Sequence, residues 1–393
     1  MVPKGWKTVT LKDLLDGQIK NGYSPNATNS ETGYWVLGLG ALADEGIISS
    51  EIKPVLPEKK VLQSLLKKDD FLVSRSNTPD KVGRSIRFKN EVENCSYPDL
   101  MMRFRIDDNK ADKEFIEHQL KSSAVRIYFK NCAAGSSSTM VKINKGILEK
   151  TPIVAPPIKE QKKIAQILST WDKAITVTEK LLTNSQQQKK ALMQQLLTGR
   201  KRLLNENGVR FNGKWEKKLL SDVADVYQPK TISQSMMSDS GYPVYGANGV
   251  IGFYQEFNHE TEQIAVTCRG STCGIVNWTQ AKSWITGNAM VINTDNYSYV
   301  SKKFLFYTLN GNDLKYLISG SGQPQITGNI KTHIINLPCI EEQQKIATVL
   351  SAADAEISTL EKKIACLKDE KKALMQQLLT GKRRVKVDEA VAA

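Results

Sequence analysis

Two carboxylates and a lysine form the pattern in this chain that comes nearest to a catalytic centre. Pro98-Asp99 is followed by Asp108-Asn109-Lys110. Asp99 and Asp108 could hold Mg²⁺ while Lys110 polarises an attacking water, which is how a metal-dependent nuclease cuts DNA. The match is loose and no clear strands surround it, so chance explains the pattern better. A self-contained, Mg-dependent nuclease therefore stays as an alternative hypothesis.

Other catalytic or cofactor sites are not indicated. Cys268 and Cys273 lie close in sequence, but no Cys or His pair is near enough to complete a zinc site. The chain has no Walker A motif for ATP, and residues 38–43 match a dinucleotide-binding loop without the βαβ unit it requires. The single Pro-Pro pair follows Ala155, so the Asn/Asp-Pro-Pro-aromatic motif of adenine methyltransferases is missing. We therefore expect a non-catalytic chain with no metal or cofactor of its own.

Charge and loop composition favour a nucleic-acid partner instead. The 393 residues carry 55 Lys and Arg against 41 Asp and Glu, a formal net charge of +14, and a basic protein gains affinity for DNA by releasing counterions. Arg, Asn and Gln can read base edges, while Ser and backbone amides hold phosphate. Such residues gather in loops of both halves, although each loop taken singly could be ordinary surface. The predicted DNA contacts are Arg75, Ser76, Lys81, Arg84, Ser136, Ser137, Ser138, Tyr245, Asn248, Arg269, Ser271, Gln323 and Gln325.

An internal repeat organises the elements that must position these loops. The eleven residues from Lys189 to Gly199 recur identically from Lys371 to Gly381, 182 residues later. The same spacing relates Glu160-Gln161 to Glu342-Gln343. The starts of the two halves also match, more weakly, around Trp6 and Trp215. The sequence is thus a duplicated unit, in which a variable globular domain precedes a constant helix.

Apolar residues spaced alternately four and three apart predict that each constant segment is a coiled-coil helix. Prolines precede both segments, and Gly199 and Gly381 follow them, as suits helix starts and ends. Lys189 and Lys371 interrupt the seam at equivalent points, where a polar residue can fix the register. The predicted seam residues are Ile164, Leu168, Trp171, Ile175, Leu182, Leu192, Leu196, Ile346, Leu350, Ile357, Leu360, Ile364, Leu367, Leu374 and Leu378.

The linker between the halves favours an antiparallel pair. Its 14 residues, 200–213, span at most ~50 Å, and a parallel pair would make them run back along a helix of roughly 58 Å. The expected fold class is α+β, with two mixed α/β domains joined by two long helices in an intramolecular antiparallel coiled coil with pseudo-two-fold symmetry. The expected segments are domains 1–158 and 214–338, helices 159–199 and 339–381, linker 200–213 and a basic tail 382–393.

Local patterns predict the content of the two domains. Strand-like runs occupy residues 34–37, 71–73, 125–129, 242–245, 264–267 and 289–292, and helices are expected near residues 112–121 and 301–309. No apolar run is long enough to cross a membrane, and the first residues contain no apolar signal core. We expect a cytoplasmic protein with reduced cysteines and no membrane partner.

These marks together resemble the specificity subunit of Type I restriction–modification systems. The resemblance rests on Pro-x-x-Glu-Gln-x-Lys-Ile-Ala, within residues 157–165 and 338–347, and on the twin Leu-Met-Gln-Gln-Leu-Leu-Thr-Gly helix ends. Residues 71–76 with Val82-Gly83 are similar to a sequence motif that is common in first target-recognition domains of this family. Residues 243–249 with 322–325 are similar to a motif that is common in second target-recognition domains.

The resemblance implies that the two domains each read part of an asymmetric, bipartite DNA target, and that the helices set a nonspecific spacer. It also implies two methylation subunits that use S-adenosylmethionine to modify adenine, and restriction subunits that use ATP and Mg²⁺ to cut DNA. The first seam has Thr178 and Ser185 where the second has Leu360 and Leu367, so the first seam is less apolar. This difference indicates either weaker packing of the first seam or a contact with a methylation subunit.

Two alternatives stay open at the level of sequence. One is the self-contained restriction endonuclease acting through Asp99, Asp108 and Lys110. The other is a coiled-coil scaffold that makes no sequence-specific DNA contact.

Overall fold

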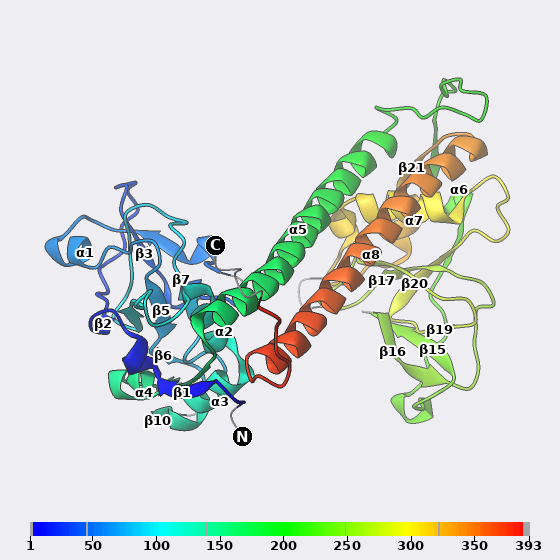
Figure 1. Ribbon diagram of the computed structural model, residues 1–393. Coiled ribbons are helices and arrows are strands. Elements are labelled where there is room, and N and C mark those ends of the chain that lie inside the picture. The colour runs from blue at the N-terminus through cyan, green and yellow to red at the C-terminus, as the bar shows by residue number, and fades with distance from the viewer. Residues whose placement is uncertain (1–2, 45, 138–139, 248, 321–322, 388–393) are drawn as a thin grey trace. The chain divides into compact units, whose positions relative to one another are not determined.

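Two compact units make up the chain in the computed structural model, which describes residues 3–44, 46–137, 140–247, 249–320 and 323–387 (Figure 1). One unit contains residues 1–178 and 363–393, and the other contains residues 179–362. Helices α5 (Ile158–Leu196) and α8 (Ile340–Leu378), each of 39 residues, contribute one part to each unit. The two long helices expected from the repeat are therefore present.

Small, mostly antiparallel sheets form the globular part of the first unit. Strands pair in the orders β2-β9-β5-β7, β4-β3-β8, β10-β11-β6 and β1-β12, with β3 and β8 parallel. The strands are β1 (Lys7–Thr10), β2 (Lys20–Asn21), β3 (Trp35–Leu37), β4 (Ile52–Pro54), β5 (Phe71–Ser74), β6 (Ser76–Asn77), β7 (Ser85–Arg87), β8 (Cys95–Ser96), β9 (Met101–Phe104), β10 (Ala134–Ser137), β11 (Met140–Lys142) and β12 (Pro152–Ala155). The shorter helices are α1 (Lys59–Gln63), α2 (Lys113–Lys121), α3 (Ser123–Cys132) and α4 (Lys145–Glu149).

The second unit repeats this topology with fewer helices. Its strands pair in the orders β14-β20-β17-β18, β16-β15-β19 and β13-β21, with β15 and β19 parallel. The elements are β13 (Glu216–Leu219), α6 (Leu220–Val223), β14 (Asp225–Tyr227), β15 (Tyr242–Gly246), β16 (Gly249–Tyr254), β17 (Ile264–Thr267), β18 (Val276–Trp278), β19 (Trp284–Ile285), β20 (Ala289–Asn293), α7 (Lys302–Gly311) and β21 (Ile334–Leu337). The duplication is clear in the sequences of the two long helices, and the matching strand orders show that it extends through both globular parts.

Residues 125–129 lie in helix α3, so the prediction of a strand there is wrong. Their β-branched and aromatic side chains suit a strand. Ser122 instead caps a helix by accepting a hydrogen bond from the Val125 amide at 3.4 Å. Val125 and Phe129, one helical turn apart, are buried in the core. The other five predicted strands and both predicted helices are present.

The repeated Glu-Gln pair fastens the start of each long helix to a domain. Gln161 accepts a hydrogen bond from the amide of Asp112, the N-cap of α2, at 2.9 Å. Gln343 accepts one from the amide of Ser301, the N-cap of α7, at 2.8 Å. Because both amides would otherwise be left without an intrahelical partner, the pair positions α2 and α7 in the same way.

The glutamate of each pair binds an arginine in the segment that follows the other long helix. Glu160 accepts hydrogen bonds from Arg384 at 2.6 and 2.7 Å and from the Trp6 indole at 3.2 Å. Glu342 accepts equivalent bonds from Arg202, both at 2.6 Å, and from Trp215 at 3.2 Å. Each buried carboxylate thus joins three segments that are distant in sequence.

The long helices run in opposite directions within each unit. In the first unit Glu160 binds Arg384, and further along α5 Asp172 binds Lys371. In the second unit the roles are exchanged, because Glu342 binds Arg202 and Asp354 binds Lys189. Partner numbers fall on one helix as they rise on the other, as an antiparallel pair requires. The lysines that interrupt the seam are those that make these ion pairs.

The fifteen predicted seam residues are all buried or half-buried. Several of them belong to domain cores: Ile164, Leu168 and Leu378 pack in the first unit's core, and Leu196 and Ile346 in the second's. The helix ends are therefore parts of the globular units. None of the helices in the described part of the chain is both long and apolar enough to cross a membrane.

Candidate nucleic-acid interface

The predicted contacts of the first unit lie where the chain leaves the buried strand β5. The Gly83 amide donates to the Ser74 carbonyl at 2.8 Å and closes the turn that follows this strand. Gly83 has a φ of +71°, and an added Cβ would lie 2.4 Å from the Phe129 ring, so glycine is required there. β6 then pairs with β11, placing Ser76 opposite Lys142. Two loops separated by about sixty residues in the sequence thus share one small sheet.

Helix α3 holds the loop that carries Lys81 and Arg84. The Arg126 guanidinium donates to the carbonyls of Val82 and Asp80, both at 2.8 Å. Burial lowers the pKa of Arg126 from its ordinary value, but an arginine stays charged at any physiological pH. The sequence predicted a strand here and not this helix, so it did not predict that Arg126 would hold the loop.

The second unit presents the same arrangement with different side chains. The Gly274 amide donates to the Thr267 carbonyl at 2.8 Å after the buried strand β17. Arg269 then pairs through its backbone with Gln325. The Thr267 hydroxyl donates to the Ala247 carbonyl, which brings the β15–β16 turn alongside. Segments around Ala247, Arg269 and Gln325 therefore lie close together in this unit.

The two sites correspond residue by residue. The Ile143 amide donates to the Arg75 carbonyl at 2.9 Å, and the Ile326 amide donates to the Cys268 carbonyl at 3.0 Å. Lys142 in the first unit therefore stands where Gln325 stands in the second. Lys142 is exposed, and it is a candidate contact that the sequence analysis missed, because only the strand pairing reveals the equivalence.

The predicted contacts differ in exposure. Lys81, Arg269, Ser271, Gln323 and Gln325 are exposed, and Arg75 and Arg84 are half-buried. Ser76 and Tyr245 are 1% and 6% exposed, so neither side chain reaches the surface as it stands. Ser136 and Ser137 belong to strand β10. Ser138 and Asn248 lie outside the described residues.

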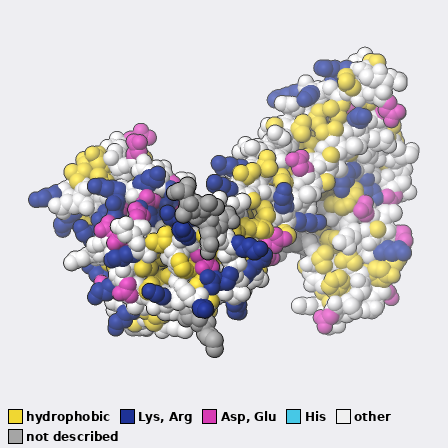
Figure 2. Space-filling view, viewed as in Figure 1, with side chains coloured by type: hydrophobic (Ala, Val, Ile, Leu, Met, Phe, Trp, Pro, Cys, Tyr) yellow, Lys and Arg dark blue, Asp and Glu magenta, His cyan; other side chains and the backbone are white. Residues whose placement is uncertain are grey.

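Basic side chains are abundant on the surface. Figure 2 shows Lys and Arg spread over the visible face of each unit, with fewer acidic side chains among them. The excess agrees with the net charge of +14. A broad basic surface attracts the DNA backbone whatever its sequence.

The residues of the nuclease pattern are engaged with separate neighbours. Asp99 accepts a hydrogen bond from Ser24, Asp108 pairs with Lys113 at 2.9 Å, and Lys110 pairs with Asp107 at 3.7 Å. In the described part of the chain, no group of three or more His, Cys, Asp or Glu side chains is arranged to hold a metal ion. The geometry gives the nuclease hypothesis no support.

Comparison with known proteins identifies the family. The family described as the Type I restriction modification DNA specificity domain matches residues 3–184 and 212–368. The chain belongs to this family. The resemblance stated from the sequence is therefore confirmed, and each match covers one globular domain and the first part of the long helix that follows it.

Relatives and solved structures agree with this assignment. The Type I restriction enzyme MjaVIII specificity subunit of Methanocaldococcus jannaschii is 24% identical over 426 residues, covering 98% of this chain and 94% of that protein. The crystal structure of a Type-I restriction-modification system S subunit from M. genitalium has a TM-score of 0.66 at 16% identity, covering 95% of this chain and 96% of that one. The second of these similarities concerns the fold alone.

Proposed function

We propose that this chain reads an asymmetric, bipartite double-stranded DNA target with a fixed nonspecific spacer. Residues 1–158 and 214–338 are the two target-recognition domains in this proposal, and each reads one half-target. The observation that carries it is the pair of equivalent sites. The same backbone pairing places Ser76 opposite Lys142 in one unit and Arg269 opposite Gln325 in the other, and Lys142, Arg269 and Gln325 are exposed. The backbone arrangement is the same in the two units, but the side chains at equivalent positions differ. Such a pair of sites suits two half-targets of different sequence.

The proposed role is non-catalytic and depends on partner subunits. Two methylation subunits would bring S-adenosylmethionine for adenine methylation, and restriction subunits would bring ATP and Mg²⁺ for DNA cleavage. The family membership and the absence of a catalytic motif in the sequence support this division of labour. Methylation subunits that bind the long helices would hold both catalytic centres at a set distance from the two half-targets.

Genome-wide mapping of adenine methylation tests the proposal. Cells that express the chain with its cognate methylation subunit should carry a bipartite methylated motif, and cells without the gene should lose that motif. If no motif depends on the gene, the reading function is wrong, and a coiled-coil scaffold without sequence-specific contact becomes the better description.

A substitution at Arg269 tests the site itself. Arg269→Ala should weaken binding to the cognate target by about 1–3 kcal/mol and relax discrimination at one base pair, as expected for a lost bidentate base contact. Lys302→Ala is not a suitable control, because Lys302 pairs with Asp295 inside the same unit. The exposed Lys331 of the second unit is suitable, and its alanine variant should leave discrimination unchanged.

A further inference from the structure

The end of the β15–β16 hairpin in the second unit exposes apolar side chains. The two strands lie side by side (Figure 1), and only Ala247 and Asn248 stand between them in the sequence. Val250 is 48% exposed and Ile251 is 49% exposed. A single exposed apolar residue is common on a protein surface, but two in a row beside a turn are not explained by packing. Val250 and Ile251 together form the apolar tip of this hairpin.

A β-bulge exposes the two side chains together. Tyr245 pairs with Val250, and Val244 pairs with Gly252, so Ile251 is an extra residue in β16. A bulge interrupts the regular alternation of side chains between the two faces of a strand and re-aims them. The bulge therefore accounts for two consecutive exposed residues in a strand that would otherwise expose one and bury the next.

Neighbouring segments fix the hairpin on either side of the apolar tip. The absent side chain of Gly246 leaves room for Ile251, because a Cβ there would lie 2.9 Å from Ile251 Cγ2. Further from the turn, the Ser238 amide donates to the Phe253 carbonyl at 2.8 Å, and the Phe253 amide donates to the Ser238 carbonyl at 3.3 Å. The apolar tip is therefore exposed on a hairpin that is held by the rest of the unit.

The apolar tip adjoins the residues proposed to read DNA. The Thr267 hydroxyl donates to the Ala247 carbonyl and joins the hairpin turn to the end of β17. Val250 is three residues from Ala247, at most about 11 Å along the chain, and Arg269 is two residues from Thr267, at most about 7 Å. Because base pairs are about 3.4 Å apart along the duplex, the apolar tip and Arg269 can reach the same short stretch of DNA.

The chemistry of the hairpin suits a base edge better than a phosphate. Residues 242–254 include no charged side chain, so they neither attract nor repel the DNA backbone. The major groove is wide enough to admit a two-stranded β-ribbon, and the apolar group that base edges present there is the C5-methyl of thymine. An uncharged ribbon with an apolar tip therefore matches thymine.

The first unit has a different residue at the corresponding position. Counted from the parallel pairs β3–β8 and β15–β19, Val36 corresponds to Tyr245. The antiparallel partner of Val36 is Lys53, and that of Tyr245 is Val250. Lys53 is exposed, and lysine is a side chain that binds phosphate. The exposed apolar residue at this position is therefore a feature of the second unit.

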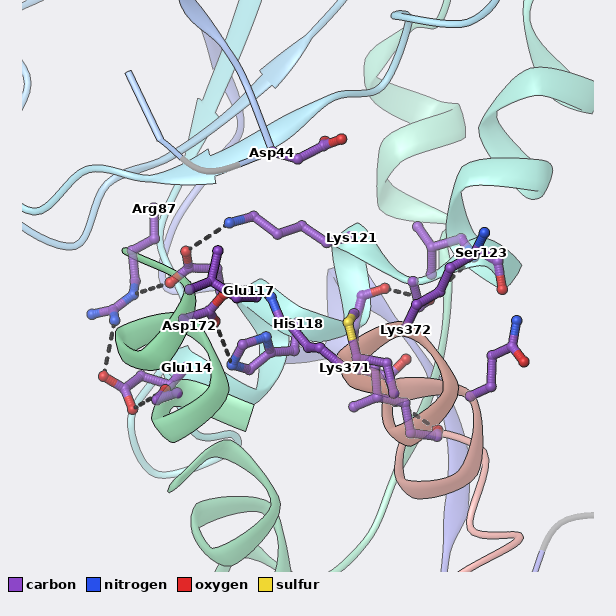
Figure 3. A pocket seen from close by; sticks show the side chains of 18 of the residues that line it. Asp44, Arg87, Glu114, Glu117, His118, Lys121, Ser123, Asp172, Lys371 and Lys372 are labelled. Carbon is purple, nitrogen blue, oxygen red and sulfur yellow. Dashed lines mark hydrogen bonds and ion pairs between the residues drawn. The ribbon is translucent and has the colours of Figure 1, made fainter. Parts of the chain in front are cut away.

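The connection from β3 to β4 also differs from the tight turn between β15 and β16. It comprises residues 38–51, and Leu42 within it is buried. Asp44 lines the pocket of about 1120 Å³ that α2 and α3 form with the adjoining parts of α5 and α8 (Figure 3). This connection therefore folds back against the helices of the first unit, and the two units differ in the part of the fold that carries the apolar tip.

We propose that Val250 and Ile251 contact the C5-methyl group of a thymine in the major groove of the half-target that the second unit reads. This inference rests on the proposed function, to which it adds a base and a chemical group. The contact distinguishes thymine from cytosine, which has no methyl group at that position, and it complements the polar contacts of Arg269 and Gln325. The first unit, with Lys53 at the corresponding position, reads its half-target without this contact.

Replacing thymine by deoxyuridine tests the contact, because it removes the methyl group and keeps the base pair. The full-length chain is assembled with its cognate methylation subunit, and binding to a duplex that carries the methylated motif is measured by fluorescence anisotropy. Each thymine of the motif is replaced in turn. We expect one replacement, in one half-target, to raise the dissociation constant of the wild type about fourfold, the factor for one buried CH₂-sized group.

The double variant Val250→Ser, Ile251→Ser should abolish this difference and bind the thymine and deoxyuridine duplexes equally. Ile334→Ser is the matched control, because Ile334 lies on β21 of the same unit and is 54% exposed. It should keep the fourfold difference. Circular dichroism and thermal unfolding of both variants check that they are folded.

The outcomes separate this contact from the proposed function. Motif-specific binding by the wild type without any deoxyuridine effect overturns the thymine contact and leaves the proposed function intact. A deoxyuridine effect that persists in the double variant, or one that Ile334→Ser also abolishes, overturns it as well. Absence of motif-specific binding by the wild type would contradict the proposed function, and this inference with it.

Discussion

Glu160 and Glu342 are buried carboxylates, and each is paired with an arginine from the segment that follows the other long helix. Arg202→Ala would leave the Glu342 carboxylate, which has no exposed side-chain area, without its partner. A buried charge that loses its partner costs about 3–5 kcal/mol. We therefore expect urea denaturation to show a loss of that order in the free energy of unfolding.

The control for this experiment is Arg200→Ala, which removes an exposed arginine two residues earlier. It should change the free energy of unfolding by less than about 0.5 kcal/mol. Combining Arg202→Ala with Glu342→Gln should recover part of the loss, because the buried charge is then removed. Equal stability of Arg202→Ala and the wild type would contradict a stabilising role for this ion pair.

His118 makes the stability of the first unit depend on pH. Burial is the main cause that lowers its pKa, from 6.5 to about 4. The unfolded chain therefore binds the proton more readily, and stability is complete above pH 6.5 and falls as the pH decreases toward 4. The shift corresponds to about 3 kcal/mol at most. His118→Gln should remove this component and flatten the dependence of the unfolding free energy on pH.

The window for this measurement is pH 6.5 to 4.5, because Glu117 titrates below it. Burial raises the pKa of Glu117, but Lys121, Lys89 and Arg87 more than compensate and bring it to about 2. The stability from Glu117 is present above its ordinary pKa of 4.5 and is lost as the pH falls toward 2. A wild type and a His118→Gln variant with parallel curves between pH 6.5 and 4.5 would contradict the assignment to His118.

At the scale of elements, Lys371–Asp172 and Lys189–Asp354 fix which residues of the long helices face each other. Lys371→Asp should lower the unfolding temperature, because two aspartates would then oppose each other in the first unit. The exchanged pair, Lys371→Asp with Asp172→Lys, should regain much of that loss. Asp172 is 47% exposed, so a coupling energy of only about 1 kcal/mol is expected from the double-mutant cycle. A coupling energy of zero would mean that apolar packing alone sets the register.

At the scale of the whole molecule, the repeat predicts that the two recognition halves act independently. Replacing residues 1–158 with the first domain of another family member should change one half of the methylated motif and leave the other half unchanged. The replacement must keep Trp6, and the residues equivalent to Asp112 and Gln119, because these contact Glu160, Gln161 and Leu379 of the long helices. Sequencing of the modified genome reads out both halves. A change in both would show that the domains do not read separately.

The sequence by itself determined the duplication, the two long helices and their antiparallel direction. These features depend on local signals: identical segments at a constant spacing, a four-three apolar period, and prolines and glycines at the helix ends. Five of the six predicted strands are present, and runs such as β5 and β17 were predictable because their buried residues are continuous in sequence. The family followed from the same repeated marks.

Only the tertiary structure decided which distant residues meet. Residues 125–129 have strand-like side chains but are helical, because Val125 and Phe129 bury one face against the core. The equivalence of Lys142 with Gln325 requires knowledge of strand pairing, which no local pattern contains. Ser76 and Tyr245 have the chemistry of DNA contacts and yet are buried. Composition and spacing indicate what a side chain can do, whereas its exposure and neighbours depend on long-range packing.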